Sequence, residues 1–270
     1  MKALQLSNFG ASNLSLVDIA LPEPRDHEVV VRLKAASLNP RDSQIIAGQF
    51  TTAVDFPLTP LSDGAGTVIA VGAAVTRFDV GDNVTTLFFP NWYSGEATAG
   101  ERAVSTGLEV SGSAREAGIF HEDSLALSAP HLSAAEAACY PCAGLTAWSA
   151  LFDKSSVTEG SWVLIQGTGG VATMGIQLAK AAGANVIVIS SSDDKLKKAE
   201  ALGADHLINY VTTPEWGARA LSCRGTALMP FWRLAGAQPL KIRSTPSVMV
   251  ATLILLGTWP ASIWASPYSP

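Results

Sequence analysis

Cysteine, histidine and charged residues are all scarce in this chain. The small number of cysteines and the net charge limit the classes of protein to which it can belong. Of 270 residues, 3 are cysteine, 4 are histidine and 15 % are charged. So few cysteines cannot build a disulfide framework, which favours a reducing, cytoplasmic setting. A net charge of −5 offers no basic surface for nucleic acid. We therefore expect a cytoplasmic protein that does not bind nucleic acid.

Long apolar runs are absent as well. The first residues enter an alternating strand pattern without the sustained apolar stretch of a secretory signal. The most apolar run, at 248–256, has about half the length that a bilayer requires, and Gly257 and Pro260 follow it. The sequence thus predicts neither secretion nor membrane insertion.

The most informative stretch lies at 163–192, where a glycine-rich turn separates two apolar runs. The run at 163–165 breaks at Gly167, apolar residues then recur at helical spacing over 174–180, and β-branched residues fill 186–189. This order predicts a strand, a tight turn, a helix and a second buried strand, which together form a βαβ unit.

The turn has the spacing of a dinucleotide-binding motif, Gly167-x-Gly169-x-x-Ala172. The first glycine makes the turn, the second lets a pyrophosphate approach the backbone, and a small third residue lets helix and strand pack closely. The alternative is that the glycines serve packing only; the strand-turn-helix-strand order favours a cofactor site. The predicted cofactor-binding residues here are Gly167, Gly169, Gly170, Val171 and Ala172.

Serines follow the second strand, where NAD-binding folds usually place an acidic residue. Ser190 and Ser191 can donate to a 2′-phosphate that a carboxylate would repel, and Lys195 adds a positive charge. Asp193 and Asp194 partly offset that charge, and ordinary loop chemistry before a helix is the alternative. We expect NADP as the cofactor, with NAD still possible.

Before this unit, residues 1–125 consist of strand and turn patterns that predict a compact, mostly antiparallel barrel. Ser133 and Glu136 then have the spacing of a capping box, which predicts a helix start.

Several motifs occur in an order that resembles the medium-chain dehydrogenase/reductase family, and most closely its zinc-free alcohol dehydrogenase-like and quinone reductase branches. They are ASLNPRD at 36–42, LSDGAG at 61–66, DVGD at 79–82, PCAGLTAW at 141–148 and the glycine turn. The resemblance implies an α/β fold: a GroES-like β-barrel catalytic domain at 1–125 and a Rossmann-type doubly wound domain at 126–220, incomplete here. It also implies hydride transfer in the cleft between them.

The same resemblance bears on metal. The zinc-dependent branch would have a cysteine where Asn39 stands and a histidine where Ser62 stands, so only Cys142 matches a position of the catalytic zinc site. One thiolate cannot form a three-ligand site. We expect no zinc, and we expect Cys142 to be a packed residue, since the sequence gives it no activating base.

Without zinc, side chains must polarise the substrate oxygen. The resemblance suggests Asn39 as the substrate-side amide and Thr146 as a hydroxyl beside the nicotinamide, a threonine bonded to its own backbone being the alternative. Gln44 and Phe50 follow Asn39 on the same segment as substrate-binding candidates. His121 and His131 fall in no catalytic motif and are expected to be loop or cap residues.

The chain changes character after Glu215, beyond which no acidic residue occurs. Prolines recur instead, at Pro230, Pro239, Pro246, Pro260, Pro267 and Pro270. Codons read one base out of frame permit strand motifs typical of the family. We therefore expect residues 221–270 to be an aberrant, irregular tail, translated out of frame from between about Ala220 and Gly225, which would leave a central strand edge uncovered.

These observations predict an NADP(H)-dependent oxidoreductase that acts without metal on a small alcohol, carbonyl or quinone-like substrate, and that is truncated and impaired as written. The alternative is an inactive nucleotide-binding sensor or partner protein. An intact family member could form a homodimer.

Overall fold

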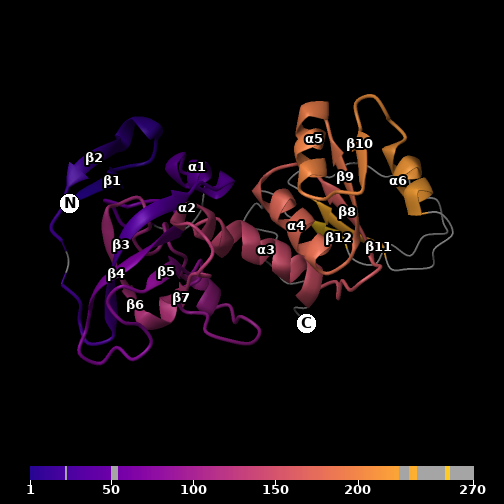
Figure 1. Ribbon diagram of the computed structural model, residues 1–270. Helices are drawn as coiled ribbons and strands as arrows, with labels where there is room; N and C mark the ends of the chain where they lie inside the picture. The colour runs from indigo at the N-terminus through magenta and orange to yellow at the C-terminus, as the bar shows by residue number, and fades with distance from the viewer. Residues whose placement is uncertain (22, 50–53, 225–230, 236–252, 256–270) are drawn as a thin grey trace, which may run out of the picture. The chain divides into compact units, whose positions relative to one another are not determined.

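The computed structural model describes residues 1–21, 23–49, 54–224, 231–235 and 253–255. These residues divide into two compact units, one ending at Cys142 and one beginning at Ala143 (Figure 1). The boundary lies later than the predicted 125/126, because β7 (Leu125–Leu127) still pairs with β5 (Asn83–Thr86) of the first unit. The Cys142 backbone also bonds within that unit.

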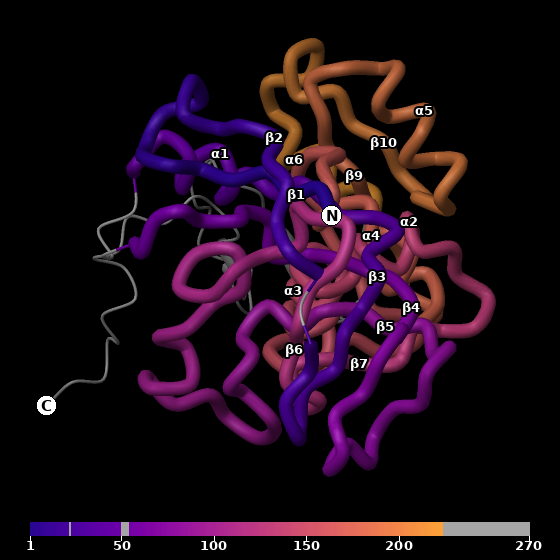
Figure 2. Tube along the Cα trace, turned by 90° about the vertical axis from the view of Figure 1, so that its left-hand side faces the viewer, coloured from indigo at the N-terminus to yellow at the C-terminus, as the bar shows by residue number. Residues whose placement is uncertain are grey.

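The first unit is built from antiparallel strands, as predicted. Its main sheet has the order β6-β3-β4-β5-β7, and β1 and β2 form a separate pair (Figure 2). The remaining elements are β1 (Lys2–Leu6), η1 (Ala11–Asn13), β2 (Leu14–Asp18), β3 (Glu28–Ser37), α1 (Pro40–Ile46), β4 (Asp63–Val71), η2 (Glu101–Ala103), β6 (Ala117–His121), η3 (Glu122–Ser124) and α2 (Ala134–Ala137).

Alternation along β3 explains the core of this unit. Val29 and Val31 point to one face and pack with Val68, Phe120 and Leu125. Each aliphatic side chain buried in this way contributes about 1.5–3 kcal/mol.

The predicted capping box starts α2. The Ser133 hydroxyl accepts from the Glu136 N–H at 3.3 Å, and the Glu136 carboxylate accepts from the Ser133 N–H at 2.9 Å. This part of the sequence prediction is confirmed.

The second unit is a parallel sheet with helices between its strands. Around the boundary at Cys142 the chain is helical, through the π-helix η4 (Tyr140–Gly144), the α-helix α3 (Leu145–Trp148) and the π-helix η5 (Ser149–Asp153). The elements that follow are β8 (Trp162–Gln166), α4 (Gly170–Ala181), β9 (Asn185–Ser190), α5 (Asp193–Ala201), β10 (His206–Asn209), α6 (Trp216–Arg224), β11 (Phe231–Ala235) and β12 (Leu253–Leu255). The strand order is β10-β9-β8-β11-β12. This is a doubly wound order: from β8 the sheet is extended first to one side, by β9 and β10, and then to the other, by β11 and β12.

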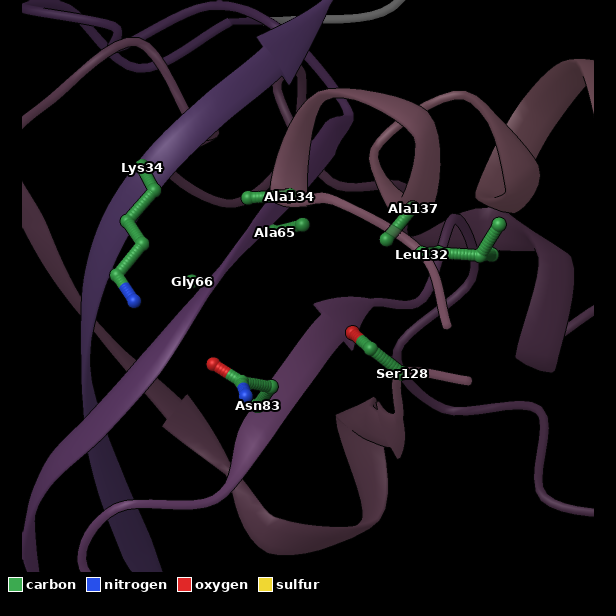
Figure 3. Close-up of a pocket in the computed structure, with 8 residues that line it drawn as sticks. All are labelled: Lys34, Ala65, Gly66, Asn83, Ser128, Leu132, Ala134 and Ala137. Atoms are coloured by element: carbon green, nitrogen blue, oxygen red, sulfur yellow. The ribbon is translucent and has the colours of Figure 1, made fainter. Parts of the chain in front are cut away.

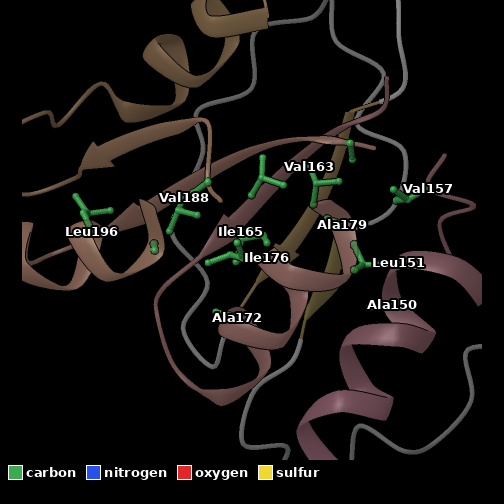
Figure 4. Packing of buried hydrophobic residues seen from close by; sticks show 14 residues of the cluster. Ala150, Leu151, Val157, Val163, Ile165, Ala172, Ile176, Ala179, Val188 and Leu196 are labelled. Carbon is green, nitrogen blue, oxygen red and sulfur yellow. The ribbon is translucent and has the colours of Figure 1, made fainter. Parts of the chain in front are cut away.

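Side chains of β8 alternate between the two faces of this sheet. Val163 and Ile165 pack with Ile176 of α4 in one cluster (Figure 4). Leu164 packs on the other face with Trp216 and Ala220 of α6. Helices therefore cover both faces, and the predicted βαβ unit is confirmed.

Two short strands lie in the segment expected to be irregular. β11 pairs in parallel with β8, and β12 pairs with β11. For these residues the expectation of irregular structure is wrong. The edge of β8 that was expected to be uncovered is paired with β11. Pro230 and Pro239 flank β11 without interrupting it, so its N–H groups remain available for the ladder. The rest of 225–270 lies outside the described residues.

Across the part of the chain that the structure describes, no helix is long and apolar enough to cross a membrane.

Candidate functional site

The glycine turn of the second unit follows β8 at the point where the strand order reverses. Gly167 has φ of 87°, a left-handed backbone that favours glycine. Gly169 has φ −80° and ψ −176°, which any residue adopts. A Cβ added at Gly169 would meet no described atom within 4 Å. The described residues therefore give a steric reason for glycine at 167 but none at 169.

The start of α4 leaves backbone donors open beside this space. Gly169 is the N-cap and no side chain caps the helix; the first intrahelical bond runs from Thr173 N to Gly169 O at 2.9 Å. The N–H groups of Gly170, Val171 and Ala172 have no acceptor within the helix, and the helix dipole is positive here. Free donors, positive potential and unfilled space suit a phosphate group. The residues present thus fit a dinucleotide.

Ala172 has the role expected of a small third residue. It is 7 % exposed and belongs to the same buried cluster as Ile165 of β8 and Ile176 of α4. A larger side chain there would separate the helix from the strand.

The end of β9 lies beside this turn, since Gly167 N donates to Ile189 O at 2.8 Å. Ser190 is buried at 3 % exposure, so of the two predicted serines only Ser191 is exposed. Ser192 caps α5 by accepting from Lys195 N at 3.4 Å. The structure therefore brings Gly167, Ser191 and Lys195 to one end of the parallel sheet.

Neighbouring acids have partners other than Lys195. Asp193 accepts from Asn209 at 2.8 Å, and Asp194 pairs with Lys197 at 3.4 Å. Lys195 has no carboxylate within 4.0 Å among the described residues. Its charge is offset less than the sequence alone indicates.

In the first unit, Asn39 sits at the N-cap of α1 and its side chain contacts a buried carboxylate. Asn39 Nδ2 donates to Asp63 Oδ2 at 3.0 Å, and Cys142 N donates to the same oxygen at 3.1 Å. Ser62 Oγ donates to Asp63 Oδ1 at 2.6 Å. Asp63 is 0 % exposed. Sequence reasoning missed Asp63; the available signal was a charged residue at the start of a strand otherwise made of small and apolar residues.

Burial dominates the electrostatics of this cluster. It raises the pKa of Asp63, and the hydrogen bonds from Ser62 and Asn39 act in the opposite direction. Burial, followed by the charge of Asp63, raises the pKa of the Cys142 thiol to about 12. Cys142 is therefore a neutral thiol at neutral pH, in agreement with the expectation that it is not a nucleophile.

A half-buried arginine, Arg41, lies in the first turn of α1. Burial lowers the pKa of Arg41. Its guanidinium donates to Thr106 O at 2.9 Å and Ser105 Oγ at 2.8 Å, and lies 4.4 Å from the centre of the Phe88 ring. Arg41 thus ties α1 to the loop at 105–106.

The other predicted residues have different outcomes. Gln44 is half-buried on α1, where its side chain makes no hydrogen bond to the described residues, and Phe50 lies outside them. Thr146 is half-buried on α3 in the second unit, and no bond from its hydroxyl to its own backbone is found there. His121 caps η3 by accepting from Asp123 N at 3.2 Å, as expected of a cap residue. His131 is exposed.

The donors in the first unit do not fit a zinc ion. Asn39 and Ser62 direct their polar groups at Asp63, so of these three positions only Cys142 offers the kind of atom that zinc binds. Zinc would require deprotonated or lone-pair donors aimed at a common point. Within the described residues, no group of three or more His, Cys, Asp or Glu could hold a metal ion.

A small pocket in the first unit lies apart from these residues. Its volume is about 210 Å³, and Lys34, Asn83 and Ser128 direct polar groups into it (Figure 3). The complete lining is Lys34, Ala65, Gly66, Asn83, Ser128, Leu132, Ala134 and Ala137. None of these is a predicted site residue.

Comparisons with known proteins cover both units. Residues 25–131 match the alcohol dehydrogenase GroES-like domain, and residues 170–226 match the zinc-binding dehydrogenase family. A zinc-type alcohol dehydrogenase-like protein of Schizosaccharomyces pombe is 44 % identical over 196 residues, which are 72 % of this chain and 57 % of that protein. The chain thus spans less than two thirds of the length of the curated relatives it matches.

Solved structures agree with these matches. The crystal structure of an NAD-dependent alcohol dehydrogenase is 35 % identical, with a TM-score of 0.75 over 88 % of this chain and 71 % of that one. A quinone oxidoreductase of Pseudomonas syringae pv. tomato DC3000 is 32 % identical, with a TM-score of 0.68 over 86 % of this chain and 65 % of that one.

Proposed function

The chain belongs to the medium-chain dehydrogenase/reductase family, with a GroES-like domain and a Rossmann-type domain, and from this premise we propose that it is an NADP(H)-dependent oxidoreductase. Its substrate is a small alcohol, carbonyl or quinone-like molecule. A nicotinamide held by the second unit supplies or accepts the hydride. Relatives named alcohol dehydrogenase and quinone oxidoreductase support this substrate range.

The observation that carries the proposal is Gly169. Its backbone tolerates any residue and the space beside it is empty of described atoms, while three open N–H groups of α4 lie next to it. Glycine at this position is explained by a ligand that comes against the backbone. Pyrophosphate bound there would accept from these N–H groups.

The preference for NADP rests on Ser191 and Lys195. An exposed hydroxyl and an unpaired ammonium group can hydrogen-bond a 2′-phosphate, whereas an acid at the end of β9 would repel it. The acids nearest to Lys195 are engaged by Asn209 and Lys197.

We propose that catalysis proceeds without metal. One Nδ2 hydrogen of Asn39 is engaged by Asp63 and the second remains to donate to a substrate oxygen. The neutral thiol of Cys142 provides no nucleophile at neutral pH. Thr146 would orient the nicotinamide from the second unit, and Gln44 would contact the substrate.

The direct test is turnover of the full chain on a panel of aldehydes, alcohols and quinones, with NADPH and NADH, before and after treatment with a chelator. The proposal expects NADPH-dependent turnover that the chelator leaves unchanged, and it expects this turnover to be slow because the sequence predicts an impaired chain. Cofactor binding without turnover on any substrate would identify a nucleotide-binding protein that lacks catalysis. Turnover lost with the chelator and restored by zinc would overturn the metal-free mechanism.

A further inference from the structure

The three positions that would hold zinc in the zinc-dependent branch all donate to one carboxylate here. Asn39 does so through its side-chain amide, Ser62 through its hydroxyl and Cys142 through its backbone N–H. All three distances lie between 2.6 and 3.1 Å. The Asp63 carboxylate thus links these three positions to one another.

Asp63 is well placed to fix its neighbours rather than to react. It is 0 % exposed at the start of β4, so no substrate in solution reaches it directly. Its Oδ2 joins the N-cap of α1 to the segment around Cys142, a residue 79 positions after Asp63 in the chain. A hydrogen bond to an ionised group is stronger than one between neutral groups, and it is shielded from water here.

Asn39 is held from two sides. Its backbone N–H donates to Asp42 Oδ2 at 2.7 Å, and its side chain donates to Asp63. The first bond fixes the main chain of the residue, whereas the second fixes the plane of the amide. Without Asp63 the amide could rotate away, although the main chain would stay in place.

We propose that Asp63 is a positioning residue, whose carboxylate orients the Asn39 amide toward the substrate. The expected effect of Asp63 on catalysis rests on the proposed oxidoreductase function. The expected orientation of the Asn39 amide does not depend on turnover.

Asp63→Asn separates charge from hydrogen bonding. The asparagine oxygen can still accept from Asn39 and Cys142, and its NH₂ group can donate to the Ser62 hydroxyl. Asp63→Ala removes all three bonds. A matched control is Glu122→Ala, since Glu122 is also a buried carboxylate of the first unit and accepts from His27, Thr76 and Arg77, away from Asn39.

The first readout needs no substrate. In a ¹⁵N-labelled sample, the side-chain NH₂ signal of Asn39 is assigned by its loss in Asn39→Asp. We expect one proton shifted downfield and slow to exchange in the wild type and in Asp63→Asn, and two ordinary, fast-exchanging protons in Asp63→Ala. Glu122→Ala should lower the melting temperature without altering this signal. An unchanged signal in Asp63→Ala, with the fold intact by circular dichroism, would overturn the proposal.

The second readout is a double-mutant cycle on kcat/KM. Asp63→Ala should lower kcat by about 10- to 100-fold with little change in KM, because a misplaced donor acts on the reacting oxygen. Asp63→Ala should have no further effect in an Asn39→Ala background, and Asp63→Asn should recover most of the loss. Fully additive effects would contradict a role through Asn39. If the wild type lacks turnover but the amide signal behaves as expected, the proposed function fails and the positioning role stands.

Discussion

Cys142 has an acid as its neighbour where a reactive cysteine would need a cation. Burial and then the charge of Asp63 disfavour its thiolate and raise its pKa to about 12. The neutral thiol therefore predominates until the pH approaches that value. Together, burial and the neighbouring carboxylate make Cys142 a poor nucleophile.

Alkylation tests this assignment. At about pH 8, we expect iodoacetamide to modify Cys142 at least ~10-fold more slowly in the folded protein than in the urea-unfolded chain, as measured by peptide mass spectrometry. The rate in the folded protein should keep rising up to about pH 10 without reaching a plateau, since the raised pKa lies above that range. Equal rates in the two states, or a plateau near neutral pH, would contradict the assignment.

Lys195 is the residue on which the proposed preference for NADP depends most. Lys195→Ala should weaken NADPH binding by about 10-fold and leave NADH binding within about 2-fold, because only NADPH carries the 2′-phosphate. Lys198→Ala, on the same helix α5, is the control and should alter neither. Calorimetric titration of both cofactors measures this, and an equal loss for both would remove the support for NADP.

Site residues could be predicted where a residue type matches a chemical need. They could not be predicted where their role depends on which side chains the fold buries or brings into contact. Asn39 and the glycines could be found from residue type and spacing. Asp63 could not be recognised as the acceptor of Asn39, because the two lie 24 positions apart and only the fold brings them into contact. Ser190 was placed correctly at the end of β9, but the sequence did not show that its side chain is buried.

In the turn between β8 and α4, Gly167 and Gly169 are glycine for different reasons: the backbone of Gly167 is left-handed, whereas that of Gly169 is not. Gly167 has φ of 87°, so Gly167→Ala should destabilise the protein by about 1–2 kcal/mol. Denaturation by urea measures this change. Gly203→Ala, at φ 102° in the turn after α5, is a control of the same backbone class away from the proposed cofactor site. If the Gly167→Ala protein is as stable as the wild type, the claim that the backbone at 167 requires glycine is contradicted.

At the scale of elements, hydrophobic periodicity predicted β8, α4 and β9, and capping-box spacing predicted the start of α2. The pattern was misread after residue 220, where prolines and missing acids suggested irregular structure. Strand β11 occupies only Phe231–Ala235, a run short enough to fit between prolines, and it gains its hydrogen bonds from β8. Pairing with a strand far away in sequence leaves no local periodic signal. The out-of-frame origin of the tail stays a prediction, which the genomic sequence across codons 218–225 decides.

For the molecule as a whole, acid sensitivity has an identifiable source in the first unit. The hydrogen bond from His27, followed by the N–H of Thr76, lowers the pKa of Glu122 from 4.5 to about 2. A carboxylate with a depressed pKa stabilises the folded state above its unfolded pKa, and this stabilisation is lost as the pH falls from about 4.5 through about 2.

Glu122→Gln keeps the size of the side chain and removes its charge. The melting temperature of this variant should lie below that of the wild type at about pH 6, and the gap should narrow as the pH falls towards about 3. Glu96→Gln, at an exposed position, should follow the wild type throughout. A gap that does not change with pH would mean that Glu122 stabilises the unit by shape alone.

The two-unit organisation, an antiparallel sheet followed by a parallel doubly wound sheet, could be predicted from the order of motifs along the chain. The division at Cys142 could not, because it depends on contacts of β7 and Cys142 rather than on a change of pattern. The cytoplasmic location, the small-molecule partner and the homodimer stay predictions.

The central claim is that the second unit binds a nicotinamide dinucleotide through the turn at Gly169, and a Gly169→Ser variant tests it most directly. Serine is a preferred N-cap residue and its Cβ meets no described atom within 4 Å, so the variant should melt at or above the wild-type temperature. Its side chain would occupy the space of the pyrophosphate, and calorimetric titration should show NADPH binding weakened by about 10-fold or more relative to the wild type. Wild-type protein that does not bind NADPH, or a Gly169→Ser protein that binds it equally well, would contradict the account.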